Sequence, residues 1–370
     1  MPASVDLDRD LRALFAQGFA APADDAAFSA LALRAFAAQY EALEPYRAYC
    51  QRRGALPTRL RHWSEIPAVP VQAFRDVRLF SDDDGTAPAA VFRTSGTTTS
   101  GARPGEHYMS AAGLARYEAS LVPMFRGFVL PELSDGQRSS LVPLVLGPPP
   151  AEAPHSSLWH MVATCSSLFE RTPRYFMPAS GLDWAGFQDE LETGAEACVI
   201  ATDLALDAWL SGAESHGFSV VLPKGSRVMH TGGPKGMRRA IPTDRLYERV
   251  QNVLGVPPSH CVNEYGMTEL SSQFYDDVLR AGRSDEAVPR LKHGPPWVRT
   301  CVVDAQALDP VPAGTPGILR VLDLANLGSV IALQTEDRAV ATPEGPFRLL
   351  GRAEGSEPRG CSLDAEAALA

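Results

Sequence analysis

Residues 263–269 read NEYGMTE, a glycine turn that directly follows the apolar segment PPSHCV. Gly266 gives the backbone room to turn or to approach a ligand, with Thr268 and Glu269 close by. The segment alone is a weak signal, because Tyr265 could equally be a core residue and the glycine an ordinary turn residue. Its meaning therefore depends on what stands elsewhere in the chain.

Four further segments of similar character occur in a defined order along the chain. TSGTTTSG occupies 94–101 after the apolar stub AAVF, and HTGGPKG at 230–236 is a glycine-rich turn after a short apolar strand. LQTEDRA at 333–339 is expected to place an acidic turn after a strand, and LGRAEGSEPRG occupies 350–360. Each segment is weak by itself, but the five in this order form a specific pattern.

The TSGTTTSG stretch permits two interpretations. Gly96 and Gly101 have the glycine spacing of a Walker A loop, and its hydroxyls and backbone N–H groups suit a phosphate. Ala102 and Arg103 stand where that motif requires Lys and Ser/Thr, which argues against a kinase or NTPase of that type. A phosphate-binding loop and a plain Ser/Thr linker both remain open from this stretch alone.

The composition limits the classes of function. The chain has 370 residues, of which 45% are apolar, enough for a sizeable core. Its net charge of −10 argues against a general nucleic-acid or anionic-membrane binder. The six cysteines form no CxxC pair and no zinc spacing, and their scatter suits a reducing compartment. The N-terminus does not resemble a signal peptide and no apolar run is long enough to span a bilayer, so we expect a cytoplasmic protein without an integral membrane segment.

Hydrophobic periodicity predicts helices over 5–53 and a connecting segment over 54–90. A strand ending at Phe92 and a helix that begins after Ser110, a good N-cap residue, are expected next. Helices and strands then alternate to a helix closed by Gly255, and strands dominate from residue 297. This order predicts a large α/β body with a β-rich subdomain.

The five segments together resemble the adenylate-forming superfamily, which includes acyl-CoA ligases and firefly luciferase. Within it, NEYGMTELSSQFYD and the ending GRAEGSEPRGCSL are similar to the LuxE-type acyl-protein synthetases. The resemblance covers about residues 90–363. It implies an α/β fold, namely the N-terminal-type large domain of an adenylate-forming enzyme with a β-rich subdomain, lacking a full C-terminal lysine domain.

The resemblance and the periodicity together divide the chain into four parts. We expect an N-terminal helical region packed on the core at 1–90 and an α/β nucleotide- and acyl-binding core at 91–296. A β-rich subdomain at 297–350 and a hinge with a short C-terminal tail carrying Cys361 at 351–370 complete the chain.

The resemblance implies a ligase that uses ATP and Mg²⁺ to activate a carboxylic acid, fatty or related, as an acyl adenylate. The nucleotide-binding residues that it implies are Ser95, Gly96, Thr97, Thr98 and Thr99 at the phosphates, Gly232, Gly233 and Pro234 in the adenine pocket, and Glu264, Tyr265, Gly266, Met267, Thr268 and Asp337.

The same resemblance assigns individual roles. Tyr265 stacks on adenine, Thr268 binds the α-phosphate, and Glu269 holds Mg²⁺ as a hard carboxylate ligand. Asp337 accepts bonds from the ribose hydroxyls, and Arg352 sits at the hinge.

Two features depart from the superfamily pattern. Thr99 occupies the place of a glycine, and no lysine follows it in the loop. No lysine occurs after Lys292 either, so the usual C-terminal lysine has no counterpart in this sequence. The candidates for the missing positive charge are Arg103, Lys235, Arg352 and Arg359.

Cys361 lies directly after the hinge motif, in PRGCSL, where Arg359 can favour its reactive thiolate form. In LuxE-type enzymes the acyl group passes to a cysteine near the C-terminus, and Cys361 occupies the matching position. The implied catalytic set is thus Cys361, Thr268, Glu269 and Arg352, and the implied product is a thioester delivered to a partner such as an acyl reductase. Two alternatives remain: a ligase that passes the acyl group to coenzyme A or a carrier protein, and a non-catalytic nucleotide-binding regulatory protein.

Overall fold

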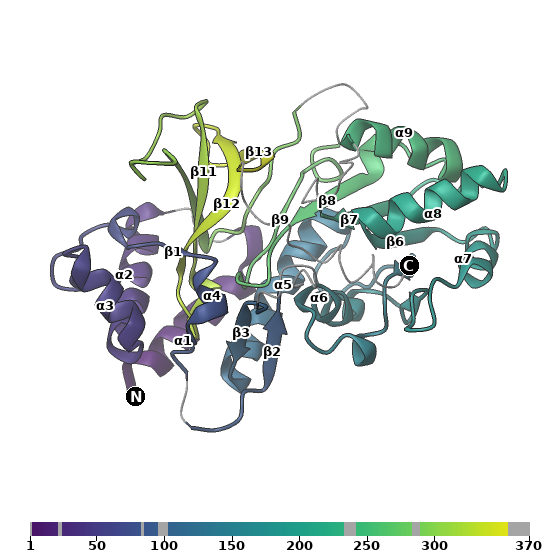
Figure 1. Cartoon of the computed structure of the whole chain (residues 1–370). Helices are drawn as coiled ribbons and strands as arrows, with labels where there is room; N and C mark the ends of the chain where they lie inside the picture. The colour runs from purple at the N-terminus through teal and green to yellow at the C-terminus, as the bar shows by residue number, and fades with distance from the viewer. Residues whose placement is uncertain are drawn as a thin grey trace.

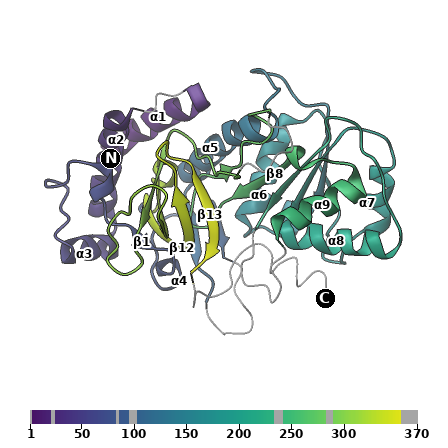
Figure 2. The same cartoon turned by 90° about the horizontal axis from the view of Figure 1, so that it is seen from above.

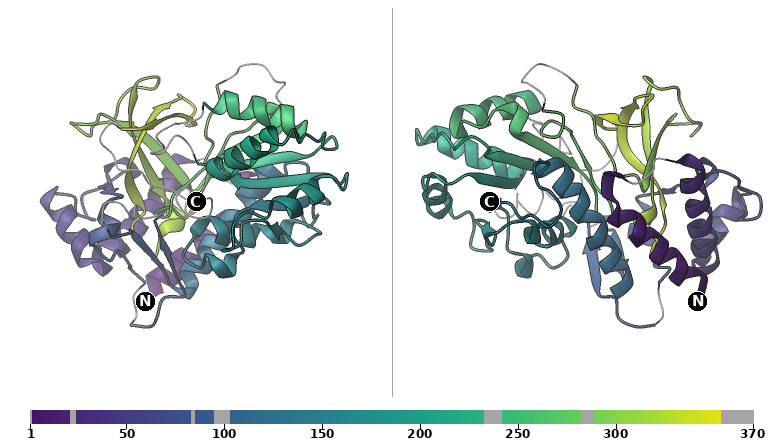
Figure 3. Two further views of the ribbon diagram at one scale, coloured as in Figure 1. Left: turned by 45° about the vertical axis from the view of Figure 1, so that its right-hand side comes forward. Right: turned by 180° about the vertical axis from the view of Figure 1, so that it is seen from behind.

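The computed structural model describes residues 2–20, 24–82, 85–94, 103–232, 242–282 and 289–353. Two large β-sheets stand side by side (Figure 1 and Figure 3). The first sheet contains the strands between residues 142 and 275, and the second contains those between 298 and 352. The N-terminal helices lie beside the second sheet, on the side away from the first sheet. Within the described residues, no helix combines the length and the apolar character that a bilayer crossing requires.

The first sheet has the strand order β5-β4-β6-β7-β8-β9, in which all neighbours are parallel except the antiparallel pair β8 and β9. The strands are β4 (Val142–Leu146), β5 (Arg174–Tyr175), β6 (Ala197–Thr202), β7 (Arg227–Thr231), β8 (Cys261–Tyr265) and β9 (Phe274–Tyr275). Every residue of β4, β6 and β7 is buried. A parallel sheet covered on both faces explains why these strands read as apolar runs rather than as alternating patterns.

Helices cover both faces of this sheet (Figure 2). On one face, α7 (Trp184–Leu191), α8 (Asp203–Ser215) and α9 (Thr243–Leu254) share a core with the outward residues of β4, β6 and β7. On the other face lie α5 (Ala111–Val129) and α6 (Ser157–Cys165). Two predicted helix ends are confirmed: the Ser110 side chain accepts the Gly113 N–H ahead of α5, and Gly255 closes α9 with a φ of 68°.

Most strands of the second sheet come from the region after residue 297, which the sequence predicts to be rich in strands. It contains β1 (Val69–Pro70), β10 (Val298–Val303), β11 (Pro316–Asp323), β12 (Ala332–Ala341) and β13 (Phe347–Arg352). The long strand β12 pairs with β11, with β13 and, in parallel, with β1. The segment 54–90 therefore does more than connect, because it supplies β1 and the short helix α4 (Ala73–Asp76).

The expectation that Asp337 lies on a turn after a strand is wrong. Asp337 lies inside β12, which continues to Ala341 because β11 and β13 pair along it. The side chains of Thr335, Asp337 and Ala339 alternate toward the buried face, so the aspartate belongs to the strand's inward-facing set.

The helices that the periodicity predicts over 5–53 are confirmed as α1 (Pro2–Ala16), α2 (Asp25–Ala42) and α3 (Glu44–Arg52). Apolar residues of these helices form one continuous core with the second sheet, α5, α6 and the inner face of the first sheet. The Phe15 and Trp297 rings, for example, lie 4.7 Å apart between their centroids. The N-terminal helices thus share a core with the regions that flank them, and the boundaries of the four predicted parts remain predictions.

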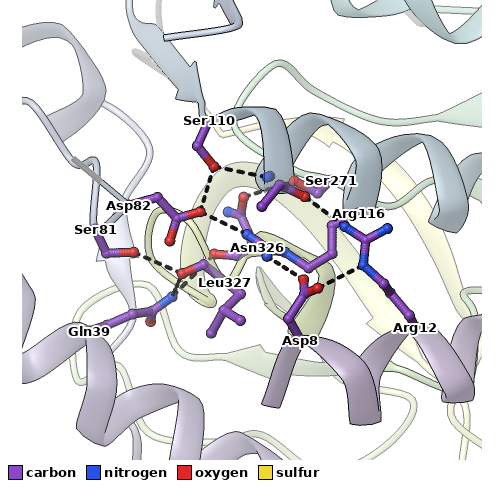
Figure 4. Close-up of polar contacts among 12 residues, drawn as sticks. Asp8, Arg12, Gln39, Ser81, Asp82, Ser110, Arg116, Ser271, Asn326 and Leu327 are labelled. Carbon is purple, nitrogen blue, oxygen red and sulfur yellow. Dashed lines mark hydrogen bonds and ion pairs between the residues drawn. The ribbon is translucent and has the colours of Figure 1, made fainter. Parts of the chain in front are cut away.

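A buried polar junction joins the N-terminal helices to the rest of the protein (Figure 4). Arg116 on α5 donates to Asp8 at 2.5 Å and to Asp82 at 3.0 Å. Gln39 on α2 donates to the carbonyl oxygens of Asn326 at 3.1 Å and Leu327 at 3.0 Å. Its own amide oxygen accepts the N–H of Ile331 at 3.1 Å, so one glutamine orders the whole segment that leads into β12.

Replacing Gln39 should therefore be costly. Its side chain is 0% exposed, and Gln39→Leu would remove three buried hydrogen bonds. The Ile331 N–H would lose its acceptor, whereas the Asn326 and Leu327 carbonyl oxygens would keep one donor each, the Ser329 N–H and the Ser81 hydroxyl. We expect the free energy of unfolding in urea to fall by about 3 kcal/mol or more. The exposed Gln17 directly follows α1, and among the described residues its side chain donates only to the Ala13 carbonyl oxygen, so Gln17→Leu should change that free energy by less than about 0.5 kcal/mol. Equal losses in the two variants would contradict the importance of the junction.

Candidate active site

Three segments meet near the carboxyl ends of the parallel strands, where open α/β sheets usually bind ligands. Gly232 follows β7, and residues 266–269 follow β8. The hairpin of β2 (Ala90–Arg93) and β3 (Glu106–Met109) reaches the same place. The Thr268 hydroxyl lies 3.5 Å from the Arg93 carbonyl oxygen, and His107 Nδ1 donates to the Thr268 carbonyl oxygen at 2.8 Å.

The hairpin carries the Thr/Ser/Gly stretch between its two strands. Thr94, the first residue of TSGTTTSG, donates its N–H to the Gly105 carbonyl oxygen at 2.9 Å. The Gly105 N–H in turn donates to the Thr94 hydroxyl at 2.8 Å. These two bonds join Thr94 to Gly105 near Thr268, and residues 95–102 between them are not among the described residues.

Glycine is required at both turns that follow β7 and β8. Gly232 has a φ of 128°, a conformation that other residues rarely adopt, and a side chain there would lie 3.2 Å from the Asp203 carboxyl carbon. A side chain at Gly266 would collide with the Glu264 carboxylate, which accepts a hydrogen bond from the Thr231 hydroxyl on the neighbouring strand. The two glycine turns are therefore tied to each other through Thr231 and Glu264.

Tyr265, Asp337 and Arg352 form one group across the two sheets. The Tyr265 hydroxyl donates to Asp337 Oδ2 at 2.8 Å, and Arg352 Nε lies 3.6 Å from Asp337 Oδ1. Asp337 and Arg352 are direct cross-strand partners in β12 and β13. Burial and the nearby Asp337 carboxylate raise the pKa of Tyr265 well above its usual value, so the phenol stays neutral and donates.

The Tyr265 ring is only 2% exposed and packs between Phe274 and Phe347, each with a centroid distance of 5.8 Å. These contacts fix the side chain and tie β8 to the second sheet. Stacking of Tyr265 on adenine and bonding of Asp337 to ribose remain predictions.

Thr268 and Glu269 form the turn after β8. Thr268 is half-buried, the neighbouring Met267 packs against the core, and Glu269 is 3% exposed. The Asn326 amide donates to the Glu269 carbonyl oxygen at 2.9 Å. Within the part of the chain that the structure describes, no cluster of three or more metal-binding side chains occurs. A single carboxylate completed by substrate phosphates is a usual way to bind Mg²⁺. Binding of Mg²⁺ by Glu269 stays a prediction.

Eight of the predicted site residues lie outside the described residues, and their roles stay predictions: Ser95, Gly96, Thr97, Thr98, Thr99, Gly233, Pro234 and Cys361. Among the candidate cations, Lys235 and Arg359 also lie outside, Arg103 is exposed, and Arg352 interacts with Asp337 and Glu336.

Three buried polar residues near the site were not predicted from the sequence: His107, Asn326 and Lys292. Lys292 Nζ donates to the carbonyl oxygen and side-chain oxygen of Asn263 in β8, at 2.6 and 2.5 Å, and burial lowers its pKa. The rarity of lysine in this chain was the one available signal for Lys292. His107 and Asn326 belong to no motif, so only their contacts reveal them.

The fold and the converging segments define the class of the protein: the large domain of an adenylate-forming ligase. The structure of 2-hydroxyisobutyryl-CoA ligase in complex with 2-HIB-AMP and CoA is similar, with a TM-score of 0.63, 16% identity and coverage of 90% of this chain and 69% of that one. The same ligase in its postadenylation state gives a TM-score of 0.62, 14% identity, and coverage of 88% and 68%. These likenesses show the fold.

A more distant likeness involves ATP-bound MatB from Rhodopseudomonas palustris, with a TM-score of 0.48, 18% identity and 72% of this chain covered. The match spans about half of MatB, 48% of its length. Among curated proteins, no significant sequence match was found.

The family is given by sequence. The family model described as acyl-protein synthetase, LuxE, matches residues 14–370, nearly the whole chain. The chain therefore belongs to the LuxE acyl-protein synthetase family, and both the predicted family and the predicted adenylate-forming fold are confirmed.

The Tyr265–Asp337 bond leads to a stability prediction. Tyr265→Phe would leave the buried Asp337 Oδ2 without this hydroxyl donor, and we expect the free energy of unfolding to fall by roughly 1–3 kcal/mol. Tyr275 is an equally buried tyrosine on β9 whose hydroxyl, among the residues that the structure describes, makes only a 3.6 Å contact with the Met161 sulfur. Tyr275→Phe should therefore cost clearly less in the same urea titration. A smaller loss for Tyr265→Phe than for Tyr275→Phe would argue against the bond.

Proposed function

We propose that this protein uses ATP to convert a carboxylic acid, of the fatty or a related class, into an acyl adenylate and then transfers the acyl group to the Cys361 thiol. Family membership over residues 14–370, which include Cys361, supports the reaction. The observation that carries the proposal is the convergence of the β2–β3 hairpin, Gly232 and Thr268–Glu269 at one end of the first sheet.

The first half-reaction joins the acid to AMP. A carboxylate oxygen attacks the α-phosphorus, the bond to the β-phosphate oxygen breaks, and pyrophosphate leaves. Thr268, whose carbonyl is fixed by His107, directs its hydroxyl to the α-phosphate. Bound at Glu269, Mg²⁺ would neutralise phosphate charge. Tyr265 and Arg352 hold Asp337 so that its carboxylate is oriented for the ribose hydroxyls.

The second half-reaction forms the thioester. The Cys361 thiolate attacks the acyl carbonyl carbon, the bond to the phosphate oxygen breaks, and AMP leaves. The thioester preserves the activation of the acyl group for a partner, which we propose to be an acyl reductase. No external oxidant or reductant is needed in either step.

The first step is tested by acid-dependent exchange of labelled pyrophosphate into ATP. With a panel of carboxylic acids from short to long chain, we expect exchange that requires both Mg²⁺ and an acid of suitable length. Thr268→Ala should lower the rate about 10²-fold, because one donor to the charged transition state is lost. A folded wild-type protein that gives no exchange with any acid would support the reading as a non-catalytic nucleotide-binding protein.

The second step is tested with radiolabelled acid. We expect ATP-dependent, hydroxylamine-sensitive labelling of the protein that disappears in Cys361→Ser, while pyrophosphate exchange in that variant persists. Cys301→Ser is the matched control, since Cys301 is half-buried in β10 and burial raises the pKa of its thiol. If label persists in Cys361→Ser, that cysteine is not the acceptor; acid-dependent transfer to coenzyme A or a carrier protein would favour the alternative ligase.

A further inference from the structure

We infer that His107 and Asn326 are positioning residues that clamp the backbone of Thr268 and Glu269, and thereby fix the two side chains for adenylation. This inference rests on the proposed function for its catalytic meaning, although the clamp itself is a feature of the fold.

The clamp consists of two hydrogen bonds to consecutive carbonyl oxygens. His107 Nδ1 donates to Thr268 at 2.8 Å, and Asn326 Nδ2 donates to Glu269 at 2.9 Å. Both side chains are 1% exposed. The Thr268 carbonyl belongs to the peptide plane between Thr268 and Glu269, and the Glu269 carbonyl to the plane that follows Glu269. Both planes beside the Glu269 Cα and one plane beside the Thr268 Cα are therefore held, which restricts the directions in which the two side chains leave the backbone.

The two donors come from different elements of the fold and lie beside each other. His107 lies on β3, directly after the Thr/Ser/Gly stretch, and Asn326 lies in the short helical turn Leu324–Asn326 that leads into β12. A shift of either element would therefore move Thr268 or Glu269. The clamp couples the hairpin, the turn after β8 and the second sheet at one point.

His107 acts here as a neutral hydrogen-bonding group. Burial lowers its pKa to about 4, so it carries no charge near neutral pH. A carbonyl oxygen can only accept, so Nδ1 must carry the proton in this contact. The Phe74 ring packs edge-on against the imidazole, with centroids 5.7 Å apart, and limits its rotation. These contacts suit a rigid support rather than a phosphate-binding cation.

Asn326 is equally well fixed (Figure 4). Its Nδ2 also donates to the Val330 carbonyl oxygen at 2.9 Å, and its Oδ1 accepts the Ser271 hydroxyl at 2.9 Å. The Ser271 N–H donates to the buried Asp323 at 2.9 Å. Gln39 from the N-terminal helix α2 holds the Asn326 carbonyl oxygen, so the clamp extends to the helical layer.

The clamp should matter to rate because small errors in position are costly: a displacement of about 1 Å can reduce a rate about 10²-fold. A purely structural role would instead lower stability without a specific link to Thr268. The two cases differ in how mutations combine, since residues that act through one another have non-additive effects.

The experiment measures pyrophosphate exchange in His107→Ala, in His107→Asn, whose amide can replace the Nδ1 donor, and in Asn326→Asp, which loses the donor but keeps an acceptor for Ser271. We expect rates roughly 10–100-fold lower for His107→Ala and Asn326→Asp, and substantial recovery in His107→Asn. In a Thr268→Ala background, His107→Ala should add less than about threefold. Multiplicative effects, or no recovery in His107→Asn, would overturn the inference.

Ser329→Ala is the matched control for the loop. It removes a buried bond to the Leu79 carbonyl oxygen at 2.7 Å without touching Thr268 or Glu269, and we expect exchange within about threefold of wild type. A loss as large as that of Asn326→Asp would show a general effect of loop damage.

Hydrogen–deuterium exchange of the peptide that covers 266–270 provides a readout independent of activity. We expect faster amide exchange there in His107→Ala and Asn326→Asp and no change in Ser329→Ala. Unchanged protection in both clamp variants would refute the clamp. If wild type shows no pyrophosphate exchange but these protection differences hold, the proposed function fails while the clamp stands.

Discussion

A buried polar segment must find hydrogen-bond partners, and this constraint governs the centre of the molecule. Residues 323–331 run between the N-terminal helices, α5 and the turn after β8, where water is excluded. Part of their backbone pairs with other backbone groups, and side chains satisfy further groups: Gln39 from α2, and Asn326 from the segment itself. Because each partner comes from a different part of the fold, the parts assemble in one arrangement.

The candidate site depends on this arrangement. Strands β7 and β8 supply glycine turns at the sheet's carboxyl end, the hairpin supplies the neighbouring Thr94, and β12 and β13 supply Asp337 and Arg352. None of these elements forms a site alone.

The sequence predicted what local chemistry determines. Ser110 as an N-cap and Gly255 as a C-terminal cap each depend on neighbours within a few residues. The five segments in their order predicted the family, because each is recognisable from a few adjacent residues.

The remaining features depend on distant partners. Asp337 was expected on a turn because aspartate is rare in strands, and only the Tyr265 hydroxyl, 72 residues away, together with Arg352 makes it acceptable there. The two-residue strand β1 contains Pro70 and is too short for a periodic pattern. His107 lies 161 residues from Thr268, a pairing that no spacing rule indicates.

The alternation of β12 also restricts how this family member can evolve. One face of the strand presents Thr335, Asp337 and Ala339 to the interior, and the intervening Arg338 is exposed. Inserting or deleting a single residue before Asp337 would reverse that order, burying a guanidinium and moving the carboxylate away from Tyr265. Substitutions along β12 preserve this alternation. A change in the number of residues between its pairing with β1 and its pairing with β13 does not.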